Sequence, residues 1–492
     1  MVNTNLAYQS TISPVAETAI KEAPVKWCSV SLSDVVSRGK RLEASVFDVE
    51  AKQARNTAVN GKYGTVILGG ETGIIDTAYY PGRFKRIYCE KPYGEAFYLP
   101  SQMTDIYPRA DKRISALTKC NIEELRLKEN TLLLTRSGTI GTISFVSKTT
   151  QGKVFSDDVI RITFKDNIDL GYTYTFLKSS VGNRILTTNG YGAVITHLEP
   201  EHLATVPIPD APKEIKERIH NLIVRSYELR DESNDLIDQA TQLLIDELHL
   251  PDIHDFDVKD YKKNAPVETY SVKLSDLNGR ADASYHVPIV DAIVEHLKKY
   301  ADEVTTVGDP RISNAVLLPP RFARVYVDEG YGRVLIGGKQ LYELDPSSKK
   351  YLSNTKHKKL LDQLEVYQNT VLITRSGTIG KVAFVPKHWE HWIPSDHIIR
   401  VVPANDAIAG YLYIFLCSDY GYELITRYTY GSVVDEIDDN HVRQIAIPLL
   451  KNKEVQKRIN DLALEANEKR YEAYKLEQQA LRIMDNEVIY AK

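Results

Sequence analysis

The sequence predicts an α+β protein: two tandem α/β globular domains, each followed by a long α-helix, with the two helices paired antiparallel as a coiled-coil rod. Three observations predict this fold class. They are a long internal duplication, a glycine-rich turn spelled identically in both copies, and an apolar heptad after each copy. A chain of 492 residues with 43% hydrophobic residues has the length of several domains and the composition of a globular protein.

The duplication is centred on the seven residues TRSGTIG, which occur at 135–141 and again at 374–380. Residues 131–209 align with 370–448 without a gap, with 30 identical residues in 79 positions. Further upstream, RFKRIY from Arg83 pairs with RFARVY from Arg321. A unit of roughly 240 residues is far longer than a solenoid repeat of about 20–50 residues. Two similar domains in tandem are therefore expected.

The pattern within each copy changes at its closing proline, Pro209 or Pro448. Before it, short runs such as TLLLTRSG and VIRITF are rich in β-branched residues and predict strands and turns. After it, apolar or small residues alternate at spacings of four and three, which predicts a heptad helix. Small residues on this seam favour a close approach of the two helices, with Lys469 at the edge. The heptad positions are Ile215, Ile219, Leu222, Ser226, Leu229, Ser233, Leu236, Ala240 and Leu243, and Val455, Ile459, Leu462, Ala466, Lys469, Ala473, Leu476, Ala480 and Ile483.

The predicted organisation has six parts. They are a flexible lead-in at 1–26, a first globular domain at 27–209, a central long helix at 210–248, a linker at 249–269, a second globular domain at 270–448 and a C-terminal long helix at 449–488. Antiparallel helices would place the two domains at opposite ends of the rod, related by a pseudo-two-fold axis. At about 1.5 Å per residue the heptad spans roughly 50 Å, enough to separate two DNA-reading domains by one turn of DNA, about 34–36 Å.

Composition excludes several classes of protein. The four cysteines, Cys28, Cys89, Cys120 and Cys417, are scattered and form no disulfide or zinc framework, so a reducing cytoplasm is expected. No stretch has the length and apolar character of a membrane span. The formal net charge is −4, with a basic excess in 51–209 and an acidic excess in 210–285. The basic excess therefore lies in the first globular domain and the acidic excess in the segment between the two domains.

Taken together, these features resemble the DNA specificity subunit of type I restriction-modification systems. Two tandem units each contain an R-S-G-T-I-G turn, a downstream S-D-x-x-I-R strand and a closing P-x-P or I-P before a long helix, and the resemblance extends from about residue 27 to 488. It implies a non-catalytic subunit in which each globular domain is a target recognition domain reading one half of a bipartite, asymmetric DNA site. The helices would set the unread spacer.

The resemblance also implies partners. They are double-stranded DNA, two modification (methyltransferase) subunits and restriction subunits with motor and nuclease activity. S-adenosylmethionine, ATP and Mg are then expected on the partner subunits and no cofactor on this chain. The sequence departs from the pattern in one respect, because its second domain is slightly acidic.

Residues identical in both copies cannot distinguish two different half-sites, so they are expected to bind the DNA backbone or to shape the fold. Hydroxyls of the glycine turn suit phosphate oxygens, and its arginine suits a phosphate or a guanine edge. In the alternative interpretation, the turn is a structural hairpin whose arginine pairs with Asp157 or Asp396. The DNA-binding candidates in the turns are Arg136, Ser137, Thr139, Arg375, Ser376 and Thr378.

Positions that differ between the copies are candidates for reading bases. They include Lys85 against Ala323, Thr142 against Lys381, and Asn189 and Gly190 against Tyr428 and Thr429, and the loops around Lys153 and Trp392. Basic residues beside aromatic residues suit DNA contact as well. For any single residue the alternative is a solvated side chain or a tyrosine in the core. The remaining DNA-binding candidates are Arg83, Arg86, Tyr191, Arg321, Arg324, Lys339 and Tyr430.

An enzyme needs a site, and the sequence contains neither a G-x-x-x-x-G-K-[ST] phosphate loop nor an N-P-P-Y tetrad. Two nuclease-like P-D…E/D-x-K matches begin at Pro209 and Pro251, but they fall at a helix start and in the linker rather than on paired strands. His388, His391 and His397 have no counterpart in the first copy, and a surface loop is favoured over a metal site. Ser137 has no repeated His and acid at suggestive positions, so no metal or catalytic residue is expected.

Two functions from different classes remain. The first is a DNA-recognition subunit that positions separate methyltransferase and nuclease chains. The second is a protein-interaction scaffold or regulator of similar architecture without its own DNA specificity. A steep fall of DNA affinity with salt distinguishes the first from the second.

Overall fold

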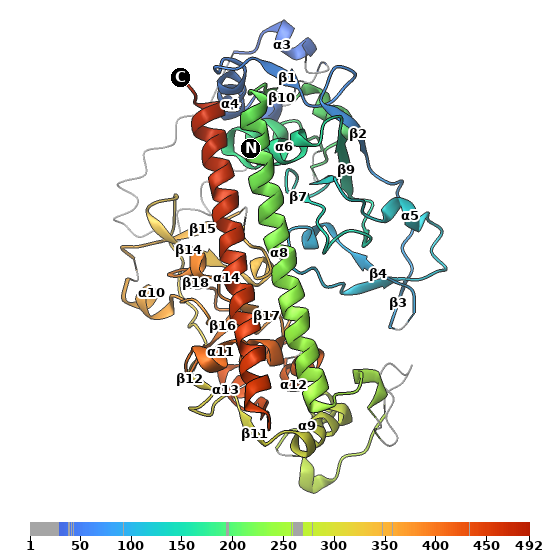
Figure 1. Ribbon diagram of the computed structural model, residues 1–492, viewed down its shortest axis with the longest axis vertical. Helices are drawn as coiled ribbons and strands as arrows, with labels where there is room; N and C mark the ends of the chain where they lie inside the picture. Colours follow the sequence, from blue (N-terminus) through green and yellow to red (C-terminus); the bar gives the residue numbers. More distant parts are fainter. Residues whose placement is uncertain are drawn as a thin grey trace, which may run out of the picture.

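The computed structural model describes residues 29–37, 40, 42, 44–91, 93–192, 196–256, 258, 269–277, 279–346, 348–356, 358–431 and 433–492. The lead-in predicted at 1–26, and much of the predicted linker, lie outside these residues. Within them the predicted fold class is confirmed: two α/β halves lie against a pair of long helices (Figure 1). In the described part of the chain, none of the helices combines the length and apolar character that a membrane crossing needs.

The first half contains short helices and ten strands within the described residues. Its helices are α3 Leu32–Ser37, α4 Val49–Val59, α5 Ile122–Leu125, α6 Ile168–Lys178 and α7 Ser180–Thr187. Its strands are β1 Thr65–Ile67, β2 Ile75–Tyr79, β3 Tyr88–Cys89, β4 Glu95–Tyr98, β5 Lys112–Ile114, β6 Leu132–Thr135, β7 Ile143–Phe145, β8 Val154–Phe155, β9 Val159–Phe164 and β10 Pro207–Pro209. The central helix α8 Lys213–Leu248 follows directly.

The second half repeats this order. Its helices are α9 Pro288–Tyr300, α10 Lys358–Leu364, α11 Asp406–Cys417, α12 Asp419–Thr426 and α13 Asp439–Arg443. Its strands are β11 Glu303–Thr306, β12 Ser313–Leu317, β13 Tyr326–Val327, β14 Gly332–Ile336, β15 Lys350–Ser353, β16 Val371–Thr374, β17 Val382–Phe384, β18 Ile393–Pro394, β19 Ile398–Pro403 and β20 Ala446–Leu449. Helix α14 Lys453–Ile483 then continues as a π-helical turn, Met484–Ile489.

The two halves share one sheet topology. The inner sheet has the order β2-β9-β6-β7 in the first half and β12-β19-β16-β17 in the second. A second, outer sheet has the order β3-β5-β4-β8 and β13-β15-β14-β18, and each contains one parallel pair, β4 with β8 and β14 with β18. A two-stranded ladder, β1-β10 or β11-β20, closes each half next to its long helix. The duplication seen in the sequence is thus a duplication of the fold.

Helices α8 and α14 lie side by side and run in opposite directions (Figure 1). Arg218 near the start of α8 pairs with Glu487 beyond the end of α14, with 2.9 Å between Nη1 and Oε2. Further along α8, Glu232 pairs with Lys469 of α14 at 2.7 Å, so the partners move backwards along α14 as α8 advances. Lys469 lies at the edge of the seam, as expected. The small heptad residues are all fully buried: Ser226, Ser233, Ala240, Ala466, Ala473 and Ala480.

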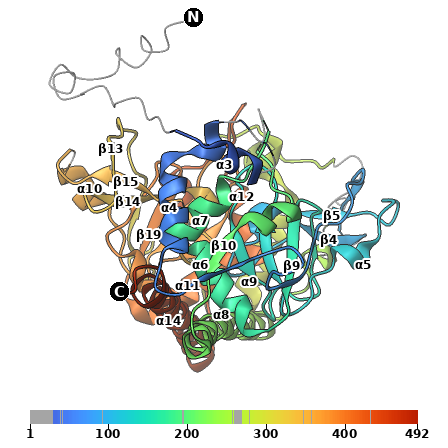
Figure 2. The same cartoon turned by 90° about the horizontal axis from the view of Figure 1, so that it is seen from above.

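Each globular half packs on both long helices. The core of the first half includes Ile219 from the start of α8 and Ile483 from the end of α14. The core of the second half includes Leu244 from the end of α8 and Ile459 from the start of α14. Figure 2 shows the two halves spread on one side of the paired helices. The rod therefore fixes where each half lies.

A buried carboxylate, Glu477 of α14, joins the first half to the rod. Lys178 at the end of α6 and Arg230 of α8 both pair with it, and the Tyr174 hydroxyl donates to it at 2.8 Å. Burial alone would raise the pKa of the Glu477 carboxyl, but the charges of Lys178 and Arg230 lower it to about 2. The carboxylate thus stays charged and connects three helices.

We expect Glu477→Gln to lower the free energy of unfolding by about 3–5 kcal/mol, because Lys178 and Arg230 would lose their shared partner in a buried site. Chemical denaturation followed by circular dichroism measures this change. The control is Glu232→Gln, which removes a partly exposed partner of Lys469 on the same rod and should cost about 1 kcal/mol or less. Equal losses for the two variants would contradict the prediction.

Candidate nucleic-acid interface

The duplicated glycine turn follows the central strand of each inner sheet, β6 or β16. Gly138 and Gly377 have φ of +76° and +74°, a backbone conformation that favours glycine. The next residues, Thr139 and Thr378, are exposed at the tip. The turn therefore presents a threonine to solvent in both halves, in keeping with the predicted hydroxyl contacts.

The arginines of the turn point inward instead. Arg136 is only 5% exposed: it donates to Glu199 at 2.6 Å, and its guanidinium lies 4.1 Å from the centre of the Tyr80 ring. Arg375 is 7% exposed, pairs with Glu436 and donates from Nε to the Ile437 carbonyl at 3.0 Å. Both guanidiniums thus pair with carboxylates inside the domain, which favours the structural alternative, and their contact with phosphate or guanine stays a prediction.

The alternative interpretation, a structural turn whose arginine pairs with an acid, named the wrong acids. Asp157 and Asp396, the carboxylates expected to hold Arg136 and Arg375, pair with Arg86 and Arg324. Glu199 and Glu436 lie about 60 residues after the turn arginines, so no local sequence pattern predicted that they would be the partners. Arg86 and Arg324 thus hold equivalent carboxylates in the two halves, and each side chain stays about 30% exposed.

Glu199 is the centre of the first of these clusters. Burial opposes its ionisation, but hydrogen bonds from Tyr191 and Arg136 lower the pKa of the Glu199 carboxyl. The Tyr191 hydroxyl donates to the same carboxylate oxygen that Arg136 binds. Arg136 of the glycine turn and Tyr191 are therefore held together by one half-buried carboxylate, Glu199.

Ser137 lies beside a histidine and an acid that the sequence did not reveal as partners. The Ser137 hydroxyl donates to Asp158 at 2.7 Å, and His197 Nδ1 lies 3.1 Å from Ser137 Oγ. In a Ser-His-Asp triad the histidine lies between the serine and the acid. Here both groups contact the serine, and in the second copy Ser376 faces His397. The arrangement fixes the turn rather than activating a nucleophile.

The remaining candidates divide by exposure. Arg83, Lys85, Arg321 and Lys339 are exposed, as are Thr139, Thr378, Tyr191 and Tyr430. Asn189 is buried, and the half-buried Tyr428 stacks on His441 at 5.5 Å between ring centres. Lys381 lies 5.2 Å from the centre of the Tyr342 ring and is half-buried. The exposed members remain predictions for DNA contact.

The three histidines near 390 have separate structural contacts. His388 forms a hydrogen bond with the Leu344 carbonyl at 2.7 Å, and burial lowers its pKa to about 4. His391 faces Glu365, and His397 faces Ser376. Among the residues that the structure describes, no group of three or more His, Cys, Asp and Glu side chains is placed to hold a metal ion.

The two halves meet through equivalent loops at the middle of the rod. Asp105 of the first half and Glu343 of the second form an antiparallel β-bridge, and the Ile106 amide donates to the Tyr342 carbonyl at 2.8 Å. Ile106 and Leu344 pack with Leu229 of α8 and Ala473 of α14. Because matching loops of the two copies pair with each other, the pseudo-two-fold axis passes through this contact.

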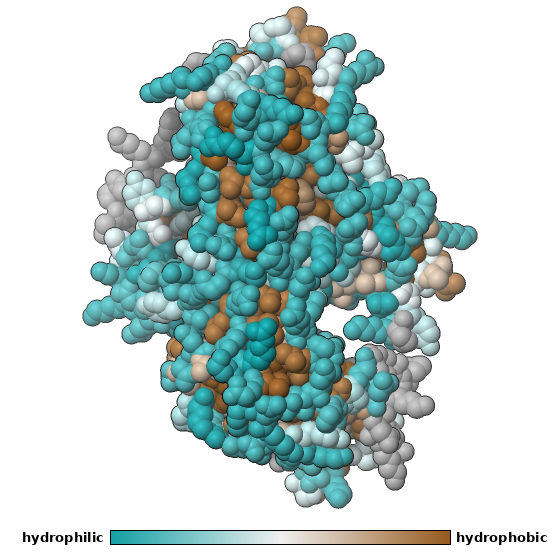
Figure 3. Space-filling model, viewed as in Figure 1, coloured by the Kyte–Doolittle hydropathy of each residue, from teal (hydrophilic) through white to brown (hydrophobic). Residues whose placement is uncertain are grey.

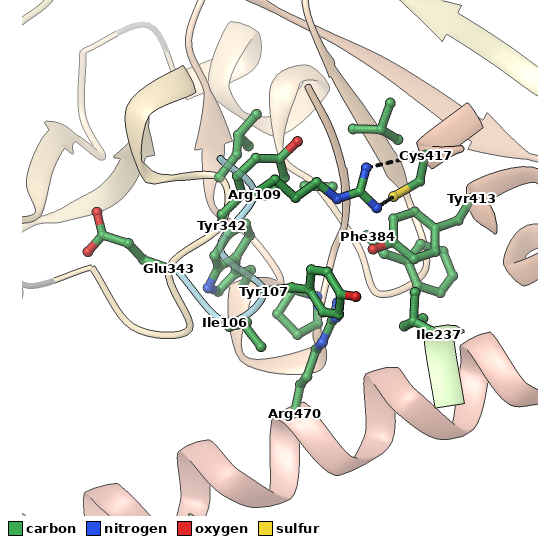
Figure 4. A pocket seen from close by; sticks show the side chains of 15 residues that line it. Ile106, Tyr107, Arg109, Ile237, Tyr342, Glu343, Phe384, Tyr413, Cys417 and Arg470 are labelled. Atoms are coloured by element: carbon green, nitrogen blue, oxygen red, sulfur yellow. Dashed lines mark hydrogen bonds between the residues drawn. The ribbon is translucent and has the colours of Figure 1, made fainter. Parts of the chain in front are cut away.

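The symmetry is broken on either side of that bridge. Arg109 of the first half extends to the second half, where it donates to the Cys417 carbonyl at 2.9 Å and to Cys417 Sγ at 3.3 Å. Beside it lies a cavity of about 40 Å³ (Figure 4). In the first half, the corresponding position opens into a cleft of about 1040 Å³ lined by Lys178, Glu477 and Lys349 among others. The position at Cys417 is therefore filled by Arg109, whereas the equivalent position at Lys178 is open.

The bridging loop gives the chain a pH-dependent stability. Burial raises the pKa of the Asp105 carboxyl to about 7, with Lys381 opposing and Glu343 adding to the rise. Since its ordinary value is about 4, the folded protein binds this proton more tightly than the unfolded chain does. The stabilisation is fully present below about pH 4 and is lost as the pH rises through about 7.

We expect Asp105→Asn to remove this pH dependence. The melting temperature of the variant, relative to that of the unaltered protein, should be higher at pH 8 than at pH 5 because a neutral amide avoids the cost of ionisation. Thermal unfolding of both proteins at the two pH values measures the difference. Glu201→Gln, at an exposed carboxylate outside this loop, is the control. A difference that is the same at both pH values would refute the role given to Asp105.

For the glycine turn, we expect Arg136→Ala to cost about 2–3 kcal/mol of stability, because it leaves Glu199 in a mostly buried site without its cation. The matched variant is Arg83→Ala, which removes an exposed arginine and should leave the melting temperature unchanged while weakening DNA binding. Thermal unfolding and a DNA titration separate the two effects. Full stability of Arg136→Ala would contradict the structural role given to this arginine.

Comparisons with known proteins place part of the chain in a family. Residues 338–465 match the family model described as "Type I restriction modification DNA specificity domain". Among curated proteins no match is found. Solved structures similar to this chain include the type I restriction-modification system S subunit from M. genitalium, at 14% identity and a TM-score of 0.30, with 85% of this chain and 97% of that chain covered. The HsdS subunit from Thermoanaerobacter tengcongensis is similar at 11% identity and a TM-score of 0.26, covering 85% and 98%.

The matched residues begin in the second half shortly after β14 and continue into α14, so they include the second glycine turn and the start of its long helix. Residues 338–465 of this chain therefore match the DNA specificity domain of the type I restriction modification family.

Proposed function

We propose that the whole chain is the DNA specificity subunit of a type I restriction-modification complex, in which each globular half reads one half of a bipartite, asymmetric DNA site. The observation that carries this proposal is the repetition of the matched domain. Residues 338–465 match a DNA specificity domain, and the first half repeats their sequence and sheet order. Two copies of one reading domain on a single chain suit a site made of two separate parts.

The chemistry of the exposed residues supports DNA as the ligand. The basic excess lies in the first half, where Arg83 and Lys85 reach solvent, and Arg321 and Lys339 do so in the second. Phosphate contacts by such residues position a protein on the duplex without specifying sequence. Lys85 stands where the second copy has Ala323, so the two halves meet DNA with different side chains.

The antiparallel rod suits the unread spacer of such a site. Helices α8 and α14 hold the two halves at a fixed separation, because each half shares its core with both. The same rod suits the docking of two methyltransferase subunits: hydrophobic residues appear between the hydrophilic ones along its free face (Figure 3). Both helices also carry half-buried leucines, among them Leu222, Leu236, Leu243, Leu464 and Leu476.

In this proposal DNA methylation and cleavage are catalysed by the partner subunits. In this proposal S-adenosylmethionine is bound by the methyltransferase subunits, and ATP and Mg are bound by these or the restriction subunits. The chain itself contributes recognition and geometry, through its exposed basic residues and its rod.

In vitro selection from random duplex DNA, using the chain purified with its candidate methyltransferase partner, tests this proposal. We expect a split consensus of two short defined blocks separated by a fixed gap of any sequence, because two rigidly spaced domains read separate turns of DNA. Affinity for the selected duplex should fall steeply as salt rises.

No enrichment by a sample shown to be folded would overturn the proposal and favour the protein-interaction scaffold. A single continuous consensus would also count against it, since that outcome would mean that only one half reads DNA.

A further inference from the structure

Each outer sheet carries an exposed tyrosine at the tip of a hairpin. Tyr93 lies between β3 and β4 and is 73% exposed, and Tyr331 lies between β13 and β14 and is 74% exposed. The two residues align in the duplication. Neither hydroxyl forms a hydrogen bond with any residue that the structure describes. A large aromatic side chain left in water at the same place in both copies contributes nothing to either core.

The backbone holds these tips in place. The residue after each tyrosine is glycine, and a Cβ on Gly94 would lie 2.2 Å from the Ile114 carbonyl oxygen. At the aligned position, a Cβ on Gly332 would lie 2.3 Å from the Leu352 carbonyl oxygen. Only glycine allows this close approach, so both hairpins are pinned to the neighbouring strand. The tyrosines are therefore presented from a rigid support.

A cation lies above a second tyrosine on each hairpin. Lys112 Nζ is 4.8 Å from the centre of the Tyr88 ring, and Lys350 Nζ is 5.6 Å from that of Tyr326. Both lysines and both rings are exposed, and these pairs also align in the duplication. The two outer sheets project on opposite sides of the molecule (Figures 1 and 2). Each half thus repeats one surface of two tyrosines and one lysine.

We infer that these two surfaces, which we call the tyrosine hairpins (Tyr88, Tyr93 and Lys112; Tyr326, Tyr331 and Lys350), contact the sugar-phosphate backbone of the DNA beside each half-site. The inference rests on the proposed function. Hydroxyl and ammonium groups donate to phosphate oxygens, and exposed rings pack against sugars. Because both copies carry the same residues, the hairpins serve a feature that both half-sites share, and the backbone is that feature.

The two hairpins differ in the charge next to the tip. Lys91 of the first hairpin aligns with Glu329 of the second, and Lys85 aligns with Ala323. The first hairpin therefore adds cations to the shared set, whereas the second places a carboxylate near its tyrosine. Since the salt dependence of DNA binding follows the number of phosphates that cations neutralise, the first hairpin carries more of it.

The test compares Tyr93→Ala, Tyr331→Ala and Lys112→Ala in the full chain, with dissociation constants measured on the selected duplex and on a scrambled duplex over a range of salt concentrations. We expect each tyrosine variant to weaken both complexes by about 3- to 10-fold, the size of one or two lost hydrogen bonds, and to leave their ratio unchanged. Lys112→Ala should lower the slope of log affinity against log salt by about one.

Tyr490→Ala is the matched control, because Tyr490 is exposed beside the end of the rod and lies on neither hairpin. It should bind both duplexes as the unaltered chain does. Unchanged affinity in Tyr93→Ala and Tyr331→Ala, with normal binding by the unaltered chain, would overturn the backbone contact alone. A loss confined to the selected duplex would overturn it too, because the tyrosines would then read bases. Failure of the folded unaltered chain to bind any duplex would overturn the proposed function together with this inference.

Discussion

The close packing of α8 against α14 is the constraint on which the rest of the structure depends. Serine and alanine fill the seam, so the helix backbones approach closely and the register of one helix on the other is fixed. Each globular half then builds its core on the start of one helix and the end of the other. Neither half can shift along the rod without opening its own core, and the separation of the two halves is thereby set by the helices.

The pseudo-two-fold symmetry of the chain is incomplete where the halves rest on the rod. The first half is seated by a buried charge cluster, in which Lys178 and Arg230 face Glu477. At the aligned position of Lys178 the second half has Cys417, which receives Arg109 from the opposite half. The first half is thus joined to the rod by the ion pairs of Glu477. The second half is joined to the first half by Arg109. These different contacts make the two halves non-equivalent although their folds match.

Identical residues in the two copies have turned out to do two different things. Arg136 and Arg375 of the glycine turn are buried against carboxylates and hold the turn to the following segment. Thr139 and Thr378 of the same turn are exposed, as are the hairpin tyrosines Tyr93 and Tyr331. Repetition in a sequence marks a shared requirement, and burial separates a requirement of the fold from one of binding.

The sequence by itself determined the duplication, the α/β character of each half and the position of the small residues on the helix seam, because these follow from local spacing and from comparing the chain with itself. It also revealed the exposed arginines Arg83 and Arg321 as candidates. Only the tertiary structure decided which carboxylate each turn arginine meets, that Asn189 is buried, and that Asp105 and Glu343 pair across the axis. Those contacts join residues far apart in the chain. Their partners depend on how strands and loops converge in space, which local pattern does not encode.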